Sequence, residues 1–197
     1  LKKEIGDNAE ISKDIDLLIS QSKRCSEILK RISTKKIEED KFFISVKLED
    51  LLEEIINSFR ETSSKKIILI SENDKNKIDI QRSPEMIYGL RNFIGNATKF
   101  SKSKVNIFLT SNRNEIEITI NDDGPGFPLD IIKKIGEPYI KSRSKELNPN
   151  SGLGLGTFLG KTLLERQNAK LLFKDDKNLG GASVIISWSP KDILLNV

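Results

Sequence analysis

The stretch Asn92-Phe93-Ile94-Gly95-Asn96-Ala97-Thr98-Lys99 is the first of three motifs that decide the fold. The second is Asp122-Asp123-Gly124-Pro125-Gly126, and the third is Gly152-Leu153-Gly154-Leu155-Gly156. Each motif alone is a weak signal. In this order they predict a nucleotide pocket with a polar helix face, a carboxylate beside a glycine turn, and a glycine-rich loop leading into a helix.

The first motif places polar side chains on one side of a predicted helix. Asn92, Asn96 and Lys99 are spaced four and then three residues apart, so they share a face. That face lies opposite the apolar stripe, and we expect it to point out of the core. An amide oxygen can complete the shell of Mg²⁺, and an ammonium can neutralise a phosphate. The motif alone is better explained as an ordinary solvated helix surface.

The second motif puts a carboxylate at the end of a strand. Asp122 could accept a hydrogen bond from an exocyclic amine such as that of adenine, while Gly124 and Gly126 let backbone and ligand approach closely. A plain Asp-Gly turn is the alternative interpretation.

The third motif is a glycine run that opens a helix. Such a run frees backbone N–H groups to bind phosphates at a helix N-terminus. It is neither a Walker motif nor a dinucleotide fingerprint.

The N-terminal part reads as a long helix over about residues 9–37. Apolar and small residues recur at alternating spacings of four and three, which predicts a coiled coil or a helical bundle. A helix packed on its own domain is the alternative. The seam consists of Ile11, Ile15, Leu18, Ser22, Cys25, Leu29 and Ile32.

The remainder alternates helices and strands after a charged linker over 35–41. Ser83 and Pro84 have the chemistry of a helix start. The mixture predicts an α+β domain with helices on one face of a mixed sheet. Further helices are expected over about 48–59, 84–100, 129–135 and from the glycine run to about 167. Strands are expected over 66–70, 77–81, 105–110, 115–121, 170–174 and 182–188.

Composition narrows the function classes. The 197 residues suit one compact domain plus an extra element, and the net charge of +4 comes from scattered lysines. We therefore expect no nucleic-acid partner, and no apolar run predicts direct membrane contact by this stretch. One cysteine excludes a disulfide framework, and histidine is absent. Because Leu1 lies inside a charged pattern, we expect the chain to be a piece of a longer one.

Taken together, the motifs resemble the N, G1 and G2 boxes of the ATP-binding domain of sensor histidine kinases, within the gyrase/Hsp90/kinase/MutL superfamily. Glu137-Pro138-Tyr139 resembles the F box, and Gly180-Gly181 resembles the last glycine box. The resemblance covers about residues 42–190. It implies a two-layer α/β sandwich with a mixed, mostly antiparallel sheet. Residues 1–37 would be the C-terminal part of a dimerisation and phosphoacceptor bundle, a helical hairpin remnant.

The resemblance also implies roles for particular residues. Asp122 would bind the adenine amino group and Asn96 would bind Mg²⁺, with Asn92 and Lys99 near metal and phosphates. Residues 127–151 would form a lid, in which two cations either reach phosphate or are solvated loop charges. The lid cations are Lys141 and Arg143, and the residues expected around ATP further include Gly124, Gly126, Gly152, Leu153, Gly154, Leu155, Gly156 and Thr157.

One position distinguishes kinases from hydrolases in this superfamily. The ATP-hydrolysing members have Glu where this chain has Asn92, and an amide cannot act as a general base. The resemblance therefore implies transfer of the ATP γ-phosphoryl to a histidine upstream of these residues and then to a response regulator. The missing histidine points to truncation, with a degenerate kinase, an ATPase clamp or a pure dimerisation module as alternatives.

A finer resemblance is to the RegB/PrrB-type redox-responding kinases. It rests on Arg24-Cys25-Ser26-Glu27-Ile28-Leu29, on Gly136-Glu137-Pro138-Tyr139 and on the residues from Gly154 to Arg166. It implies a homodimer through helix 9–37, with Cys25 as a possible redox switch, in the cytoplasmic part of a membrane-anchored sensor. A small buried hydrophobic residue is the more usual role of a free cysteine.

Overall fold

The computed structural model describes residues 45–72, 78–128, 132–138 and 155–194. They belong to the second of two units, residues 43–197. The predicted helix 9–37 and the linker after it lie outside the described residues. The elements are β1 (Ser45–Lys47), α2 (Leu48–Arg60), β2 (Lys66–Glu72), β3 (Asp79–Gln81), α3 (Pro84–Phe100), β4 (Lys104–Ser111), β5 (Ile116–Asp122), a 3-10 turn (Ile132–Lys134), α4 (Leu155–Glu165), β6 (Lys170–Asp175), β7 (Ala182–Trp188) and α5 (Pro190–Ile193).

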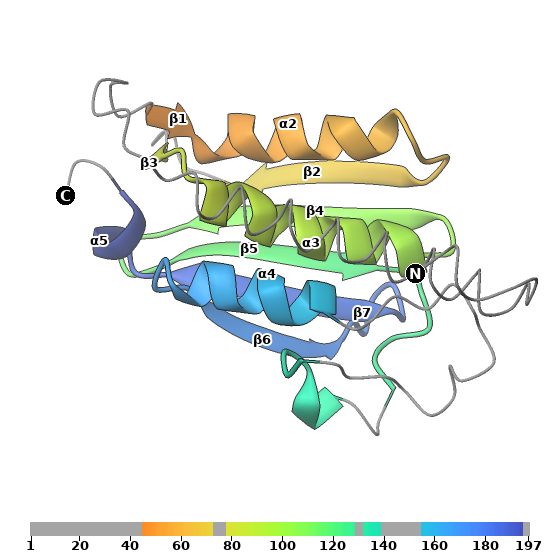
Figure 1. Ribbon diagram of the computed structural model, residues 1–197. Coiled ribbons are helices and arrows are strands. Elements are labelled where there is room, and N and C mark those ends of the chain that lie inside the picture. Colours follow the sequence, from red (N-terminus) through yellow and green to blue (C-terminus); the bar gives the residue numbers. More distant parts are fainter. Residues whose placement is uncertain (1–44, 73–77, 129–131, 139–154, 195–197) are drawn as a thin grey trace, which may run out of the picture. The chain divides into compact units, whose positions relative to one another are not determined.

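The main sheet has five strands in the order β2-β4-β5-β7-β6 (Figure 1). β2 and β4 are parallel because helix α3 lies between them along the chain and carries the crossover. All other pairs in this sheet are antiparallel. The expected mixed, mostly antiparallel sheet is therefore confirmed.

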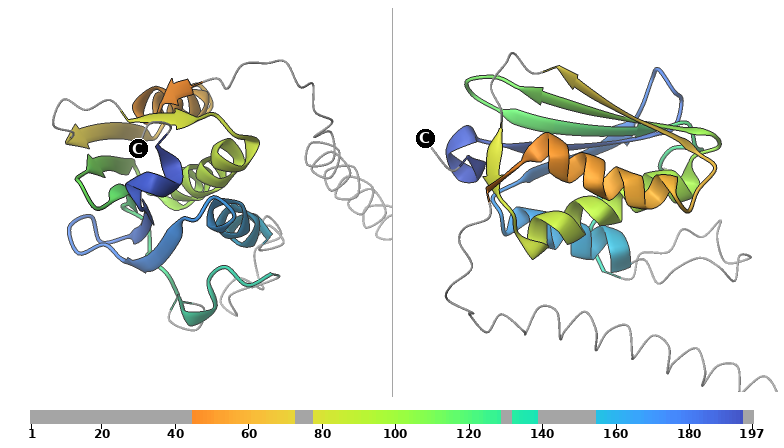
Figure 2. Two further views of the ribbon diagram at one scale, coloured as in Figure 1. Left: turned by 90° about the vertical axis from the view of Figure 1, so that its left-hand side faces the viewer. Right: turned by 90° about the horizontal axis from the view of Figure 1, so that it is seen from above.

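Helices α2, α3 and α4 cover one face of this sheet (Figure 2). The alternation in β5 turns Ile116, Ile118 and Ile120 toward the helices, where they are buried. Leu90 and Ile94 of α3 meet them from the helix layer and are fully buried. One core thus joins the two layers, as expected for a two-layer α/β sandwich.

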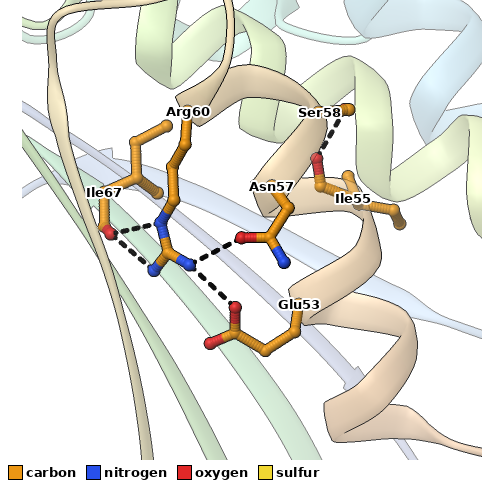
Figure 3. Close-up of polar contacts among 6 residues, drawn as sticks. All are labelled: Glu53, Ile55, Asn57, Ser58, Arg60 and Ile67. Carbon is orange, nitrogen blue, oxygen red and sulfur yellow. Dashed lines mark hydrogen bonds and ion pairs between the residues drawn. The ribbon is translucent and has the colours of Figure 1, made fainter.

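Side-chain hydrogen bonds stabilise the start of α3 and the end of α2. At the start of α3, Ser83 Oγ accepts a hydrogen bond from the Met86 backbone N–H at 3.1 Å, and Pro84 occupies the first turn. At the end of α2, Arg60 Nη2 and Nε donate to the Ile67 carbonyl oxygen at 2.8 and 3.2 Å (Figure 3). This arginine ties the helix to strand β2.

Some short elements differ from the prediction. The helix expected over 129–135 is a 3-10 turn at Ile132–Lys134, with residues 129–131 outside the described part. Strand β1 and helix α5 were not predicted. Both are too short to show a period, and β1 exists because it pairs with β3.

Candidate functional site

The structure brings parts of the three motifs to one end of the sandwich. The C-terminal half of α3, the end of β5 and the start of α4 lie together at the right-hand side of Figure 1. Leu155 is the first residue of α4. The remaining predicted residues Lys141, Arg143, Gly152, Leu153 and Gly154 lie outside the part that the structure describes.

Asp122 is a buried carboxylate with one oxygen held by the backbone. Its side chain is only 4% exposed. Oδ1 accepts hydrogen bonds from the backbone N–H of Gly124 at 2.8 Å and of Ala182 at 3.2 Å. Oδ2 accepts no hydrogen bond from any described residue. That oxygen is therefore available to a donor on a ligand.

Two glycines make room for this arrangement. A Cβ on Gly181 would overlap the Asp122 carbonyl oxygen and would lie 2.5 Å from the backbone nitrogen of Gly124. A Cβ on Gly124 would lie 2.5 Å from the Phe100 carbonyl oxygen. In the sequence, Gly180-Gly181 resembles the last glycine box of the family. Its contact with Asp122, about 60 residues away along the chain, was not predicted.

The pKa values of the two neighbouring carboxyls in the second motif shift in opposite directions. Burial raises the pKa of Asp122 above its ordinary 3.8, although Gly124 and Ala182 N–H groups oppose it and the charges of Asp123 and Asp176 add to it. Burial would also raise the pKa of Asp123. Hydrogen bonds from the Ser103 hydroxyl and from the N–H groups of residues 102–104 outweigh burial and hold that pKa well below its ordinary value.

The polar face of α3 is only partly solvated. Lys99 is exposed, as expected, and its Nζ lies 5.5 Å from the centroid of the Phe100 ring. Asn92 and Asn96 are half-buried instead, because α4 packs against them. Both amides lie outside the hydrophobic core, but their cover by α4 was not foreseen, since a single helix pattern does not show a second helix packing against it.

Both amides have a fixed partner for their nitrogen. Asn92 Nδ2 donates to the Tyr88 carbonyl oxygen at 2.8 Å. Asn96 Nδ2 donates to Thr157 Oγ1 on α4 at 3.2 Å. No described residue donates to Asn96 Oδ1. The amide oxygen is thus the end left for a ligand.

Helix α4 approaches α3 closely because its facing residues are small. A Cβ on Gly156 would lie 3.3 Å from Asn92 Oδ1, and a Cβ on Gly160 would lie 3.0 Å from Asn92 Cβ. The interhelical contact therefore confines Asn92 from the side of α4. The sequence marks Gly156 as part of the glycine motif, whereas the role of Gly160 was missed.

Gly126 occupies a turn that favours glycine, with φ of 75°. Beside it, Asp175 Oδ1 accepts a hydrogen bond from the Phe127 backbone N–H at 2.9 Å. This contact anchors the chain after the second motif to the end of β6. It lies where the predicted lid begins.

The donor set suits a hard cation shared with a ligand rather than a protein-only cage. Among the described ranges, no group of three His, Cys, Asp or Glu side chains could hold a metal ion. An unengaged amide oxygen is a suitable Mg²⁺ ligand when phosphates supply the others. Asn96 fits that requirement.

Comparisons with known proteins concern the family and the fold of this chain. The family model described as "Histidine kinase-, DNA gyrase B-, and HSP90-like ATPase" matches residues 82–192. The sensor histidine kinase RegB of Cereibacter sphaeroides is 33% identical over 88% of this chain, and the chain spans 39% of that relative. A mycobacterial sensor histidine kinase, MprB, has a TM-score of 0.62 at 17% identity, covering 75% of this chain and 97% of its own.

A further structure of similar fold is full-length ShkA in complex with AMPPNP. Its TM-score is 0.64 at 18% identity, covering 95% of this chain and 40% of that chain. No helix within the described residues is long and apolar enough to cross a membrane.

Proposed function

The chain belongs to the histidine kinase-, DNA gyrase B- and HSP90-like ATPase family, and from this premise we propose that it is the ATP-binding catalytic part of a two-component sensor histidine kinase. It would donate the ATP γ-phosphoryl to a histidine on another segment, from which a response regulator receives it. These 197 residues contain no histidine.

The observation that carries the proposal is the state of Asp122. One oxygen is committed to two backbone N–H groups, and the other accepts nothing from the described residues. An ionised carboxylate oxygen only accepts hydrogen bonds, so an oxygen that no described residue donates to favours a ligand with an N–H group. The exocyclic amine of adenine is such a group.

The phosphate end of the site would lie between α3 and α4. Asn96 Oδ1 would bind Mg²⁺, with Asn92 and Lys99 beside the metal and phosphates. Bound ATP would supply the phosphoryl group for transfer, and Mg²⁺ would neutralise part of the phosphate charge. The residues of this chain position that group, since phosphoryl transfer depends mainly on orientation and electrostatic stabilisation.

The amide at position 92 supports transfer over hydrolysis. Asn92 Nδ2 is engaged with the Tyr88 carbonyl oxygen, and an amide cannot take a proton from water at neutral pH. Neither Asn92 nor Asn96 can therefore act as a general base. ATP held here would react with an added acceptor faster than with water.

The test uses the 197-residue chain with radioactive ATP and Mg²⁺. We expect binding of a non-hydrolysable ATP analogue, no stable labelling of the chain itself, and labelling of a separately added histidine-bearing helical hairpin. Steady ATP turnover with Mg²⁺ alone would instead select an ATPase clamp. Absence of nucleotide binding would select a pure interaction module.

We further propose that helix 9–37 forms a homodimer in the cytoplasmic part of a membrane-anchored sensor, with Cys25 on the shared seam. The heptad spacing of the sequence supports the pairing. Light scattering over a dilution series, with and without a thiol oxidant, measures it. A mass equal to one chain at every concentration would contradict the dimer.

A further inference from the structure

The contact between Asn96 and Thr157 joins the metal-binding amide to helix α4. Thr157 lies in the first turn of α4, and its hydroxyl oxygen is 3.2 Å from Asn96 Nδ2. The two residues are 61 positions apart, so only the packing of α4 against α3 brings them together. The contact joins two side chains, whereas the glycine motif is expected to act through its backbone N–H groups.

An asparagine amide presents two chemically different ends. A hard cation binds the oxygen and is repelled by the NH₂ group, so a ligand role requires the nitrogen to have another acceptor. In this structure the Thr157 hydroxyl is that acceptor. A side chain held in this orientation before the cation arrives loses less rotational freedom on binding.

We propose that Thr157 is a positioning residue, which sets the orientation of Asn96 for Mg²⁺ and so raises the affinity for the metal-bound nucleotide. The inference rests on the proposed function, because it takes Asn96 as the metal ligand. It assigns Thr157 an effect through Asn96 rather than a direct contact with phosphate. Its hydroxyl therefore matters only while the Asn96 amide is present.

The experiment measures the affinity of the 197-residue chain for AMPPNP by calorimetry, once with Mg²⁺ and once with EDTA. The readout is the ratio of the two affinities, which a general loss of stability changes little. Thr157→Val keeps the shape of the side chain and removes the hydroxyl. Thr157→Ser restores the hydroxyl.

We expect T157V to lower the Mg²⁺-dependent ratio about fivefold, the effect of losing one hydrogen bond, and T157S to keep the wild-type ratio. Thr162→Val, the same change five residues further along α4, is the matched control and should leave both affinities unaltered. Equal ratios for T157V and the wild type would overturn the inference, as would equal losses in T157V and T157S.

A double-mutant cycle separates action through Asn96 from direct phosphate binding. In an Asn96→Ala background, T157V should change the ratio no further. If T157V still lowered the ratio fivefold in that background, Thr157 would act by direct contact with the phosphates, and the inference would be overturned. If the wild-type chain does not bind AMPPNP at all, the proposed function fails instead, so the two failures are distinguishable.

Discussion

The two halves of the site are built by different means. Around Asp122, backbone groups hold the carboxylate, and the glycines at 124 and 181 leave no space for a side chain. Between α3 and α4, Asn96 is held by a side-chain hydrogen bond to Thr157. Asn92 is confined by the close approach of Gly160. We call these the carboxylate corner and the amide seam.

This difference predicts different tolerance to change. The carboxylate corner depends on backbone positions that cannot shift without disturbing paired strands β5 and β7. The amide seam depends on the spacing of two helices, which can move by tenths of an ångström at small cost. Substitutions at the corner should therefore affect folding and binding together, whereas substitutions at the seam should affect mainly the metal-dependent part of binding.

The largest effect is expected at Gly181. Gly181→Ala places a Cβ against the Asp122 carbonyl oxygen and the Gly124 nitrogen, both backbone atoms. We expect a loss of about 3 kcal/mol in the free energy of unfolding, measured by urea denaturation, together with loss of nucleotide binding.

Gly180→Ala is the matched control. Its φ is 79°, and a Cβ there meets nothing within 4 Å, so only the backbone conformation opposes the change. The expected cost is about 1 kcal/mol. Equal losses at the two positions would show that the corner is not sterically restricted.

Asp122→Asn tests adenine recognition with little change in shape. The new amide oxygen can still accept from Gly124 and Ala182, but the free carboxylate oxygen is replaced by a donor. We expect about a 10- to 100-fold lower affinity for AMPPNP, because hydrogen bonds to charged groups are among the stronger ones. The measurement is calorimetric titration.

The inosine analogue of the same nucleotide distinguishes recognition from damage. Inosine carries an oxygen in place of the exocyclic amine, so D122N should bind it no worse than the wild type does. A parallel loss for both nucleotides would indicate a disturbed pocket rather than a lost adenine contact.

Gly160→Ala tests the amide seam. Its Cβ would lie 3.0 Å from Asn92 Cβ and 3.1 Å from the Phe93 ring, so α4 must move slightly away. We expect a net loss of about 1 kcal/mol, because overpacking outweighs the gain in helix propensity. Affinity with Mg²⁺ should fall more than affinity in EDTA.

Gly95→Ala on α3, the other helix of the seam, provides the comparison, because its Cβ would meet only the end of the Phe59 ring. We expect stability close to that of the wild type. If G160A lowered both affinities equally, the seam would not be specific to the metal-dependent part of binding.

The smallest effects concern pH. Asp123 has a lowered pKa, so its stabilising contribution is present above 3.8 and is lost as the pH falls below that value. Asp123→Asn should therefore flatten the decline in stability in that acid range, measured by urea denaturation at successive pH values. Asp122 has a raised pKa, so its ionisation costs stability as the pH rises above 3.8.

D122N should consequently gain stability relative to the wild type as the pH increases from 3.8 toward neutrality. The two variants thus have opposite pH signatures although the residues are adjacent. If the stability of both variants relative to the wild type changed with pH in the same direction, the two carboxyls would not have different environments.

Much of the fold was predictable because its signals are local. Alternation marked β5 as a half-buried antiparallel strand, and Ser83-Pro84 marked the start of α3. The second motif marked Asp122 as a ligand-binding carboxylate candidate, since strand end and glycine turn are adjacent in sequence. These features depend on a few neighbouring residues, whose conformational preferences act over short range.

The sequence by itself determined the types of the longer elements, the identity of the polar residues and the absence of a general base at position 92. Only the tertiary structure decided that Gly181 packs against Asp122 and that Thr157 holds Asn96. Each pair is separated by about 60 residues, and no local period encodes which distant segments meet. The strand order and the packing of α4 on α3 bring them together, because burying the common core fixes those neighbours.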